Sequence, residues 1–283
     1  MDGGRTHQVW RAVRAPRAWV AGLELGLALA ACATSLSAHD VWLEPSSFAP
    51  RAGEVVKVHV LVGEGFRGES VPRWPSRFFD FWIGDSAQRK PVLGVTGVSP
   101  AGVVRVSRDA AGWRIVHYAS RPKSIELSPE RFAQHLASEG LEQALQLHLR
   151  TASGAPVREV YSRCASALIA VAGEPDELPP APDDCALTLW PLETDPGAAT
   201  DRAVEFEVRK NGAPIEGALV RALRRDDPER VLEARTDARG RAVFPALEPG
   251  RWLVKTLHME RVPDTPADWR SWWASLTFER LKG

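Results

Sequence analysis

The sequence has no net charge, and it lacks the motifs of the common enzyme classes. Its 36 Lys and Arg residues balance 36 Asp and Glu residues. A protein that binds nucleic acid or an anionic membrane electrostatically needs a basic surface, so the balance argues against both partners. Paired-cysteine zinc spacings, a His-Glu-x-x-His motif and a Gly-x-Ser-x-Gly nucleophile turn are also missing. We therefore expect a protein that is not an enzyme.

No apolar run is long enough to cross a bilayer, which takes about 20 residues. The best candidate, residues 18–31, follows an arginine-rich start and precedes Ser37-Ala38. This order is typical of a secretory signal peptide. We expect residues 1–38 to be removed on export to the periplasm. His39 would then be the first residue of a mature chain without a membrane span.

A second processing site remains open. Residues 29–32, Leu-Ala-Ala-Cys, fit a lipoprotein box, in which cleavage precedes a lipidated cysteine. Cleavage before Cys32 would place His39 inside the chain, and its backbone nitrogen would then be an amide instead of a free amine.

The chain has only three cysteines. Cys32 lies in the export segment, which leaves Cys164 and Cys185 as an even pair. A disulfide is permitted in an exported protein, and two buried thiols are the alternative.

From residue 41 onward, short strands dominate the pattern. Val56, Val58, Val60 and Val62 alternate with other residues, which predicts a strand with one buried side. The glycine-rich residues 63–68 lack the lysine and hydroxyl of a phosphate-binding loop, so we interpret them as a turn.

A helical insertion interrupts the strands near residues 128–150. Ser128 is a good N-cap, Pro129 suits the first helical position, and Gly140 can end the helix. His135 and His148 fall on this insertion. We interpret both as solvated or partly buried histidines without a functional role.

A second β module begins near residue 201. Asn211-Gly212 is a strong hairpin signal, and short strands with turns follow. Residues 201–283 resemble the carboxypeptidase-regulatory or transthyretin-like Ig-type repeat. We therefore expect a mainly β protein with two antiparallel β-sandwich modules, Ig-like or jelly-roll-like. They would span residues 39–200, including the helical insertion, and 201–283.

Several stretches of the mature chain together match one family. They are residues 38–45, 62–68, 139–141, 161–168, 252–259, 267–269 and 273–278. In these motifs the chain resembles the DUF4198 proteins, bacterial periplasmic proteins once grouped with NikM-type nickel transport components. The resemblance implies a role in nickel or cobalt uptake, with a membrane transporter component as partner. The metal-binding role that the resemblance implies can be assigned to His39 and, more weakly, to His258.

The chemistry of His39 agrees with this implication. A terminal histidine offers an amine, an imidazole and the next backbone amide, and imidazole suits nickel, copper and zinc. His258 is the predicted second ligand, at the end of an expected strand. His59, His117 and Asp40 are weaker candidates. Nickel or cobalt is the expected ion, with copper as an alternative.

Three functions remain open. The first is a periplasmic metal-binding protein that serves nickel or cobalt uptake. The second is an Ig-like envelope module without metal, and the third is a copper enzyme built on a terminal-histidine brace. Metal titration separates the envelope module from the other two, and an oxygen-consumption assay identifies the enzyme.

Overall fold

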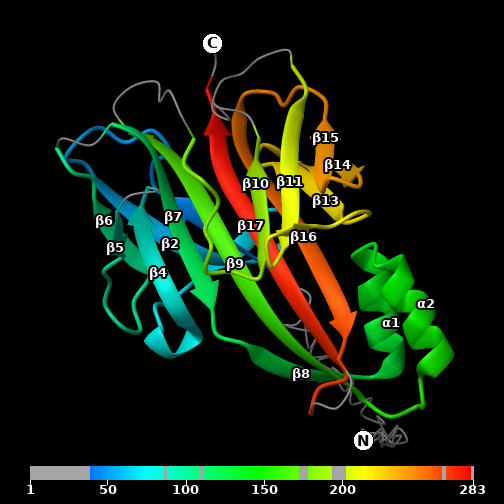
Figure 1. The fold of residues 1–283 in the computed structure, drawn as a ribbon. Helices are drawn as coiled ribbons and strands as arrows, with labels where there is room; N and C mark the ends of the chain where they lie inside the picture. The colour runs from blue at the N-terminus through cyan, green and yellow to red at the C-terminus, as the bar shows by residue number, and fades with distance from the viewer. Residues whose placement is uncertain are drawn as a thin grey trace, which may run out of the picture. The chain divides into compact units, whose positions relative to one another are not determined.

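A nine-stranded mixed sheet forms the centre of the structure, a computed structural model that describes residues 39–85, 88–108, 111–171, 178–192, 202–262 and 266–281. Residues 1–38, including Cys32 and the expected signal peptide, lie outside the described residues. The strand order is β14-β13-β16-β17-β9-β7-β4-β5, and β8 pairs with β9 (Figure 1). The strands are β4 (Phe78–Gly84), β5 (Arg89–Pro91), β7 (Gly112–Ser120), β8 (Lys123–Leu127), β9 (Val157–Val171), β13 (Leu219–Arg224), β14 (Asp227–Arg235), β16 (Gly250–Arg261) and β17 (Trp269–Arg280).

The pairing of β9 with β17 joins the two halves of the chain. These strands run parallel, with Trp269 opposite Glu159 and Thr277 opposite Ala167. The mainly β architecture with a helical insertion is confirmed. The expected modules 39–200 and 201–283, however, share this central sheet, and their described residues form one compact unit. Alternation predicts strands, but it carries no information about which distant strands pair.

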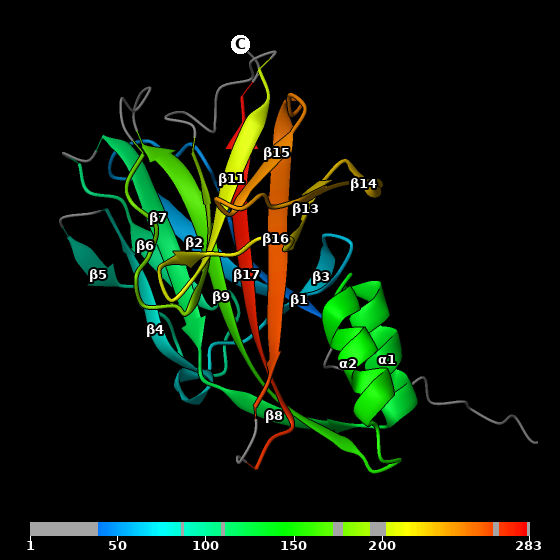
Figure 2. The same cartoon turned by 45° about the vertical axis from the view of Figure 1, so that its right-hand side comes forward.

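Two four-stranded sheets lie on opposite sides of the central sheet (Figure 2). One contains β1 (Asp40–Pro45), β2 (Val55–Glu64), β3 (Arg67–Val71) and β6 (Gly102–Arg105). The other contains β10 (Leu187–Pro191), β11 (Val204–Lys210), β12 (Ala213–Pro214) and β15 (Arg241–Phe244). A short 3-10 turn, η1 (Pro75–Arg77), precedes β4.

Alternating side chains of the central strands contribute to the two largest hydrophobic cores, one on each face of the sheet. Val254 and Phe278 pack with Phe206 beneath the β10–β11 sheet. Val116 and Leu43 belong to the other core, beneath the β1–β2 sheet. The predicted valine alternation on β2 is confirmed, since Val56, Val58 and Val60 are buried in this second core.

Two helices, α1 (Pro129–Ser138) and α2 (Glu142–Thr151), pack near β8 and one end of β16. The predicted N-cap is confirmed, because the Ser128 hydroxyl accepts a hydrogen bond from the Arg131 amide. Gly140 ends α1 at φ +65°, where a Cβ would lie 2.5 Å from a Leu219 methyl group. Among the described residues, no helix has the length and apolarity needed to span a membrane.

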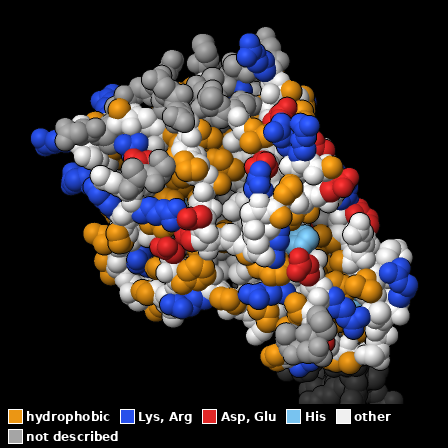
Figure 3. All heavy atoms as spheres, viewed as in Figure 1, with side chains coloured by type: hydrophobic (Ala, Val, Ile, Leu, Met, Phe, Trp, Pro, Cys, Tyr) orange, Lys and Arg blue, Asp and Glu red, His pale blue; other side chains and the backbone are white. Residues whose placement is uncertain are grey.

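Charged side chains of both signs are mixed over the face shown in Figure 3. Lys and Arg side chains alternate there with Asp and Glu side chains instead of gathering into one patch. This distribution agrees with the balanced composition of the chain.

The first strand is tied to the central sheet through its own backbone. β1 is an edge strand of its sheet, so one row of its polar backbone groups has no partner strand. Ser275 Oγ on β17 donates to the Val41 carbonyl at 2.7 Å, and Thr277 Oγ1 donates to the Leu43 carbonyl at 2.6 Å. The two hydroxyls therefore satisfy the edge and hold β1 against β17.

We predict that Thr277→Val lowers the free energy of unfolding by about 1–3 kcal/mol, because it leaves a buried carbonyl unpaired at constant side-chain shape. Thr188→Val is the matched control, since the Thr188 hydroxyl lies 3.5 Å from the Arg209 carbonyl, at the limit of a hydrogen bond. Urea unfolding of both variants measures the difference. Equal losses would contradict the role assigned to the β17 hydroxyls.

Candidate functional site

His39 is the first residue that the structure describes, and groups from two other strands hold it. Arg163 on β9 donates from Nη2 to the His39 carbonyl at 3.1 Å. The imidazole Nε2 lies 3.9 Å from Glu64 Oε1 at the end of β2. The His39 side chain is 22% exposed. The residue is therefore fixed through its backbone, while its ring remains partly accessible.

The neighbouring Asp40 is buried and paired. Lys255 Nζ on β16 lies 2.6 and 2.9 Å from the two carboxylate oxygens of Asp40. Burial raises the pKa of the Asp40 carboxyl, and Lys255 opposes this effect. Since Lys255 engages both oxygens, Asp40 acts here as an ion-pair partner, although the sequence had suggested it as a weaker metal ligand.

Further polar groups surround this ion pair. Glu139, at the end of α1, lies 3.9 Å from Lys255 and 3.0 Å from Arg221. We use the name seam cluster for the polar residues between β1 and α1 on this face of the central sheet. They are His39, Asp40, His135, Glu139, Arg163 and Lys255.

His135 is the unusual member of the seam cluster. Its ring stacks on Trp273 at a centroid distance of 5.8 Å, and neither ring nitrogen has a hydrogen-bond partner among the described residues. Burial lowers the pKa of His135; nearby Glu159 opposes this effect, and Arg163 adds to it. The sequence predicted a solvated or partly buried histidine, but the ring is buried, at 6% exposure, because the helix turns it toward Trp273 on β17.

His258 lies away from His39. Side chains alternate along a strand, so His258, three positions after Lys255 on β16, faces the opposite side of the central sheet. There it stacks on Trp272, and its Nε2 lies 2.8 Å from Glu260 Oε1. The structure therefore does not bring His39 and His258 together, which corrects the expectation that they share one ion.

His59 is also separated from His39. It lies opposite Glu44 in the β1–β2 pair, whereas Asp40 lies opposite Gly63. Four positions along a strand correspond to about 13 Å. The His59 Nδ1 instead contacts Ser70 Oγ at 2.8 Å.

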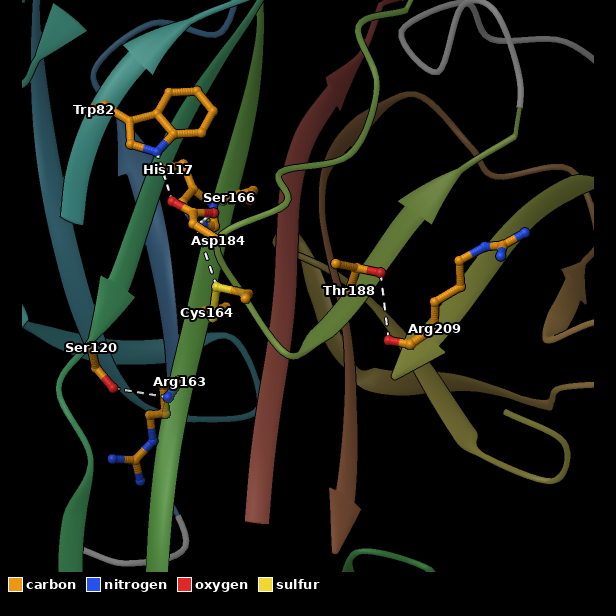
Figure 4. Close-up of a disulfide and its surroundings, with 10 residues drawn as sticks. Trp82, His117, Ser120, Arg163, Cys164, Ser166, Asp184, Thr188 and Arg209 are labelled. Atoms are coloured by element: carbon orange, nitrogen blue, oxygen red, sulfur yellow. Dashed lines mark hydrogen bonds and ion pairs between the residues drawn. A yellow bond between two sulfur atoms is a disulfide. The ribbon is translucent and has the colours of Figure 1, made fainter. Parts of the chain in front are cut away.

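His117 lies next to the Cys164–Cys185 disulfide, whose formation is confirmed with a Cα–Cα distance of 6.4 Å. His117 Nε2 is 3.1 Å from Asp184 Oδ1 and 3.4 Å from Cys185 Sγ (Figure 4). Within the described ranges, only His117, Cys164 and Cys185 bring three ligand atoms within 4.8 Å of one another. Burial opposes ionisation of Asp184, but hydrogen bonds from His117 and Trp82 hold the pKa of its carboxyl well below its usual range.

Sequence reasoning missed Arg163, Lys255, Glu64 and Asp184. For Lys255, the sequence did contain a signal, which is a charged residue inside an otherwise apolar predicted strand. Lys255 follows Leu253 and Val254, and both of these residues are fully buried. A buried lysine or arginine needs a partner, but the sequence does not say which acid provides it.

The described residues define a mainly β protein whose first strand carries a buried ion pair and whose central sheet carries one disulfide. The chain belongs to the DUF4198 family, since that family's model, described as a domain of unknown function, matches residues 36–260. The resemblance to the DUF4198 family drawn from the sequence motifs is thereby confirmed, whereas the relation to NikM-type components stays a prediction. No curated protein matches the chain.

Solved structures show only weak similarity. The D0-D1 domain of intimin is 11% identical, with 84% of this chain and 97% of that chain covered at a TM-score of 0.20. Murine CEACAM1b is 10% identical, with 86% and 100% covered at a TM-score of 0.20. Similarity at this level does not establish a shared fold.

We predict that His135 makes the protein less stable in acid. Its pKa is lowered in the folded state, so the unfolded chain binds the extra proton as pH falls below about 6.5. The contribution of His135 to the free energy of unfolding is therefore fully present above that pH. Below it, the free energy of unfolding decreases by at most ~1.4 kcal/mol per pH unit for one proton.

Urea unfolding of wild type and His135→Phe between pH 7.5 and 5.5 tests this prediction. The phenyl ring can keep the contact with Trp273 but does not titrate. We expect a smaller pH slope in the variant, and identical slopes would contradict the prediction.

Proposed function

We propose that this is a non-catalytic periplasmic protein that binds one divalent transition-metal ion at His39 after processing. Nickel or cobalt is the proposed cargo, copper is an alternative, and a membrane transporter component is the proposed partner. The observation that carries the proposal is the anchoring of His39, through Arg163 at its carbonyl and through the Asp40–Lys255 pair beside it. Chain termini usually fray unless they are tied down, and a terminal chelate needs an ordered residue.

The groups around His39 suit this chemistry. Cleavage after Ala38 would give His39 a free amine next to its imidazole, so that one residue supplies two nitrogen donors. Glu64 Oε1 lies 3.9 Å from the imidazole and is largely exposed. Its carboxylate can complete the donor set or orient the ring. Nitrogen and oxygen donors of this kind bind nickel and copper.

The envelope module without metal is the second candidate, and one observation favours it. Asp40 and Glu139 are already engaged by Lys255 and Arg221, so these acids are not free to bind an ion. On this view the seam cluster only holds β1 in place. The metal titration below separates the two candidates.

We predict that the chain beginning at His39 binds one Ni²⁺ in calorimetric titration. His39→Ala should remove most of the affinity, and an extra glycine ahead of His39 should have a similar effect because it converts the amine to an amide. Glu64→Gln should weaken binding by roughly 10- to 100-fold if it orients the ring. Affinity should fall with decreasing pH, because both the amine and the imidazole must be deprotonated to bind the ion.

His258→Ala is the matched control, and it should leave the affinity unchanged because His258 lies on the other face of the central sheet. Equal affinity in the wild-type, glycine-extended and His39→Ala proteins would contradict the proposal. The envelope-module candidate would then be preferred.

A further inference from the structure

A second polar group lies across the central sheet from the seam cluster. We use the name disulfide cluster for His117, Cys164, Asp184 and Cys185, which come from β7, β9 and the loop before β10. Arg163 and Cys164 are consecutive on β9, so their side chains point to opposite faces of the sheet. The disulfide cluster is therefore separate from His39 and takes no part in the proposed function.

Two distances from His117 Nε2 in the disulfide cluster match the edges of a metal tetrahedron. With Zn–S of about 2.3 Å and Zn–N of about 2.0 Å, tetrahedral angles place sulfur and nitrogen about 3.5 Å apart. The observed separation of Cys185 Sγ and His117 Nε2 is 3.4 Å. Nitrogen and carboxylate oxygen should be about 3.3 Å apart, and His117 Nε2 and Asp184 Oδ1 are 3.1 Å apart. To form the site, the two bonded sulfurs would have to separate, and the Asp184 carboxylate, which is not among the three ligand groups that lie within 4.8 Å of one another, would have to move toward them.

The groups behind these ligand atoms are already in place. His117 Nδ1 contacts Ser166 Oγ at 2.8 Å, which fixes the ring and leaves Nε2 toward the sulfurs. Trp82 Nε1 donates to Asp184 Oδ2 at 2.9 Å and leaves Oδ1 toward His117. Metal-binding histidines and carboxylates are usually oriented by such outer hydrogen bonds. The same arrangement does not fit a Cys-His-Asp triad, because sulfur and carboxylate both approach Nε2.

Space for an ion adjoins the sulfurs. A cavity of about 10 Å³ is lined by His117, Cys164, Ser166 and Cys185 together with residues of β10 and β17. Both cysteines are partly exposed, so a small reductant can reach them. His117 is 1% exposed, and its ring lies under Trp82 at a centroid distance of 5.2 Å.

We propose that reduction of the Cys164–Cys185 disulfide opens a tetrahedral zinc site formed by both sulfurs, His117 Nε2 and Asp184 Oδ1. A dithiol reductant supplies the two electrons by thiol–disulfide exchange, and its own sulfurs become the new disulfide. The protein gains two thiols, and Zn²⁺ binding releases their two protons. Zinc fits because thiolate and imidazole are its usual ligands and because four protein ligands close the site.

Co²⁺ titration of the reduced protein tests the proposal, because tetrahedral cobalt–thiolate sites absorb strongly in the visible and near-ultraviolet. The His39→Ala background removes the other proposed site, so the two proposals can fail separately. We expect one Co²⁺ per reduced chain, with a tetrahedral spectrum that Zn²⁺ abolishes by displacement, and no such spectrum for the oxidised chain. Asp184→Asn should weaken Co²⁺ binding at least about 10-fold.

Cys164→Ser/Cys185→Ser and His117→Gln are the decisive variants. The double serine variant should show no thiolate bands under any redox condition. If His117→Gln bound Co²⁺ as tightly as the parent, with the same spectrum, the sulfurs would be acting as an ordinary dithiol chelator and the proposal would be overturned.

Reduction can also unfold the chain, and circular dichroism would detect this. In that case Zn²⁺ should restore the folded signal to the parent protein but not to His117→Gln, since an ion that binds only the folded state stabilises it. Failure of Zn²⁺ to refold the reduced parent would overturn the proposal.

Discussion

The buried ion pair between Asp40 and Lys255 fixes the position of the first strand. Asp40 is 3% exposed, and Lys255 lies 2.6 Å from it. Loss of one partner from a buried pair typically costs about 3–5 kcal/mol, whereas replacement of both by apolar residues is often neutral. The pair therefore contributes more to where β1 lies than to net stability. The β17 hydroxyls at Val41 and Leu43, and Arg163 at His39, all depend on that position.

The two faces of the central sheet differ in chemistry. One face carries the ionic contacts of the seam cluster between β1 and α1, and the other carries the disulfide cluster beneath Trp82. Arg163 and Cys164 show how a single strand serves both faces with adjacent residues. Strand alternation places the two clusters on opposite faces of the sheet. Substitutions in one cluster can therefore be tested without changing the other.

Local features of the fold were predictable from the sequence. Alternation identified β2, and the Ser128-Pro129 pair identified the start of α1. Asn211 and Gly212 adopt φ of 50° and 80°, as the hairpin signal predicted. The parallel pairing of β9 with β17 was not predictable, because nothing local specifies it. Asp40 and Lys255 are 215 positions apart, so their contact follows from that long-range topology. For the same reason, sequence reasoning placed His258 beside His39, although strand parity turns it away.

We propose above all that the fold holds His39 in place as the metal-binding residue of the processed chain. Anomalous diffraction at the nickel edge, from crystals of the oxidised chain beginning at His39, measures this most directly. We predict one anomalous peak within bonding distance of the His39 amine and imidazole, on the side of Glu64. A peak at His258 or elsewhere in place of this one, or no peak at saturating nickel, would contradict the claim.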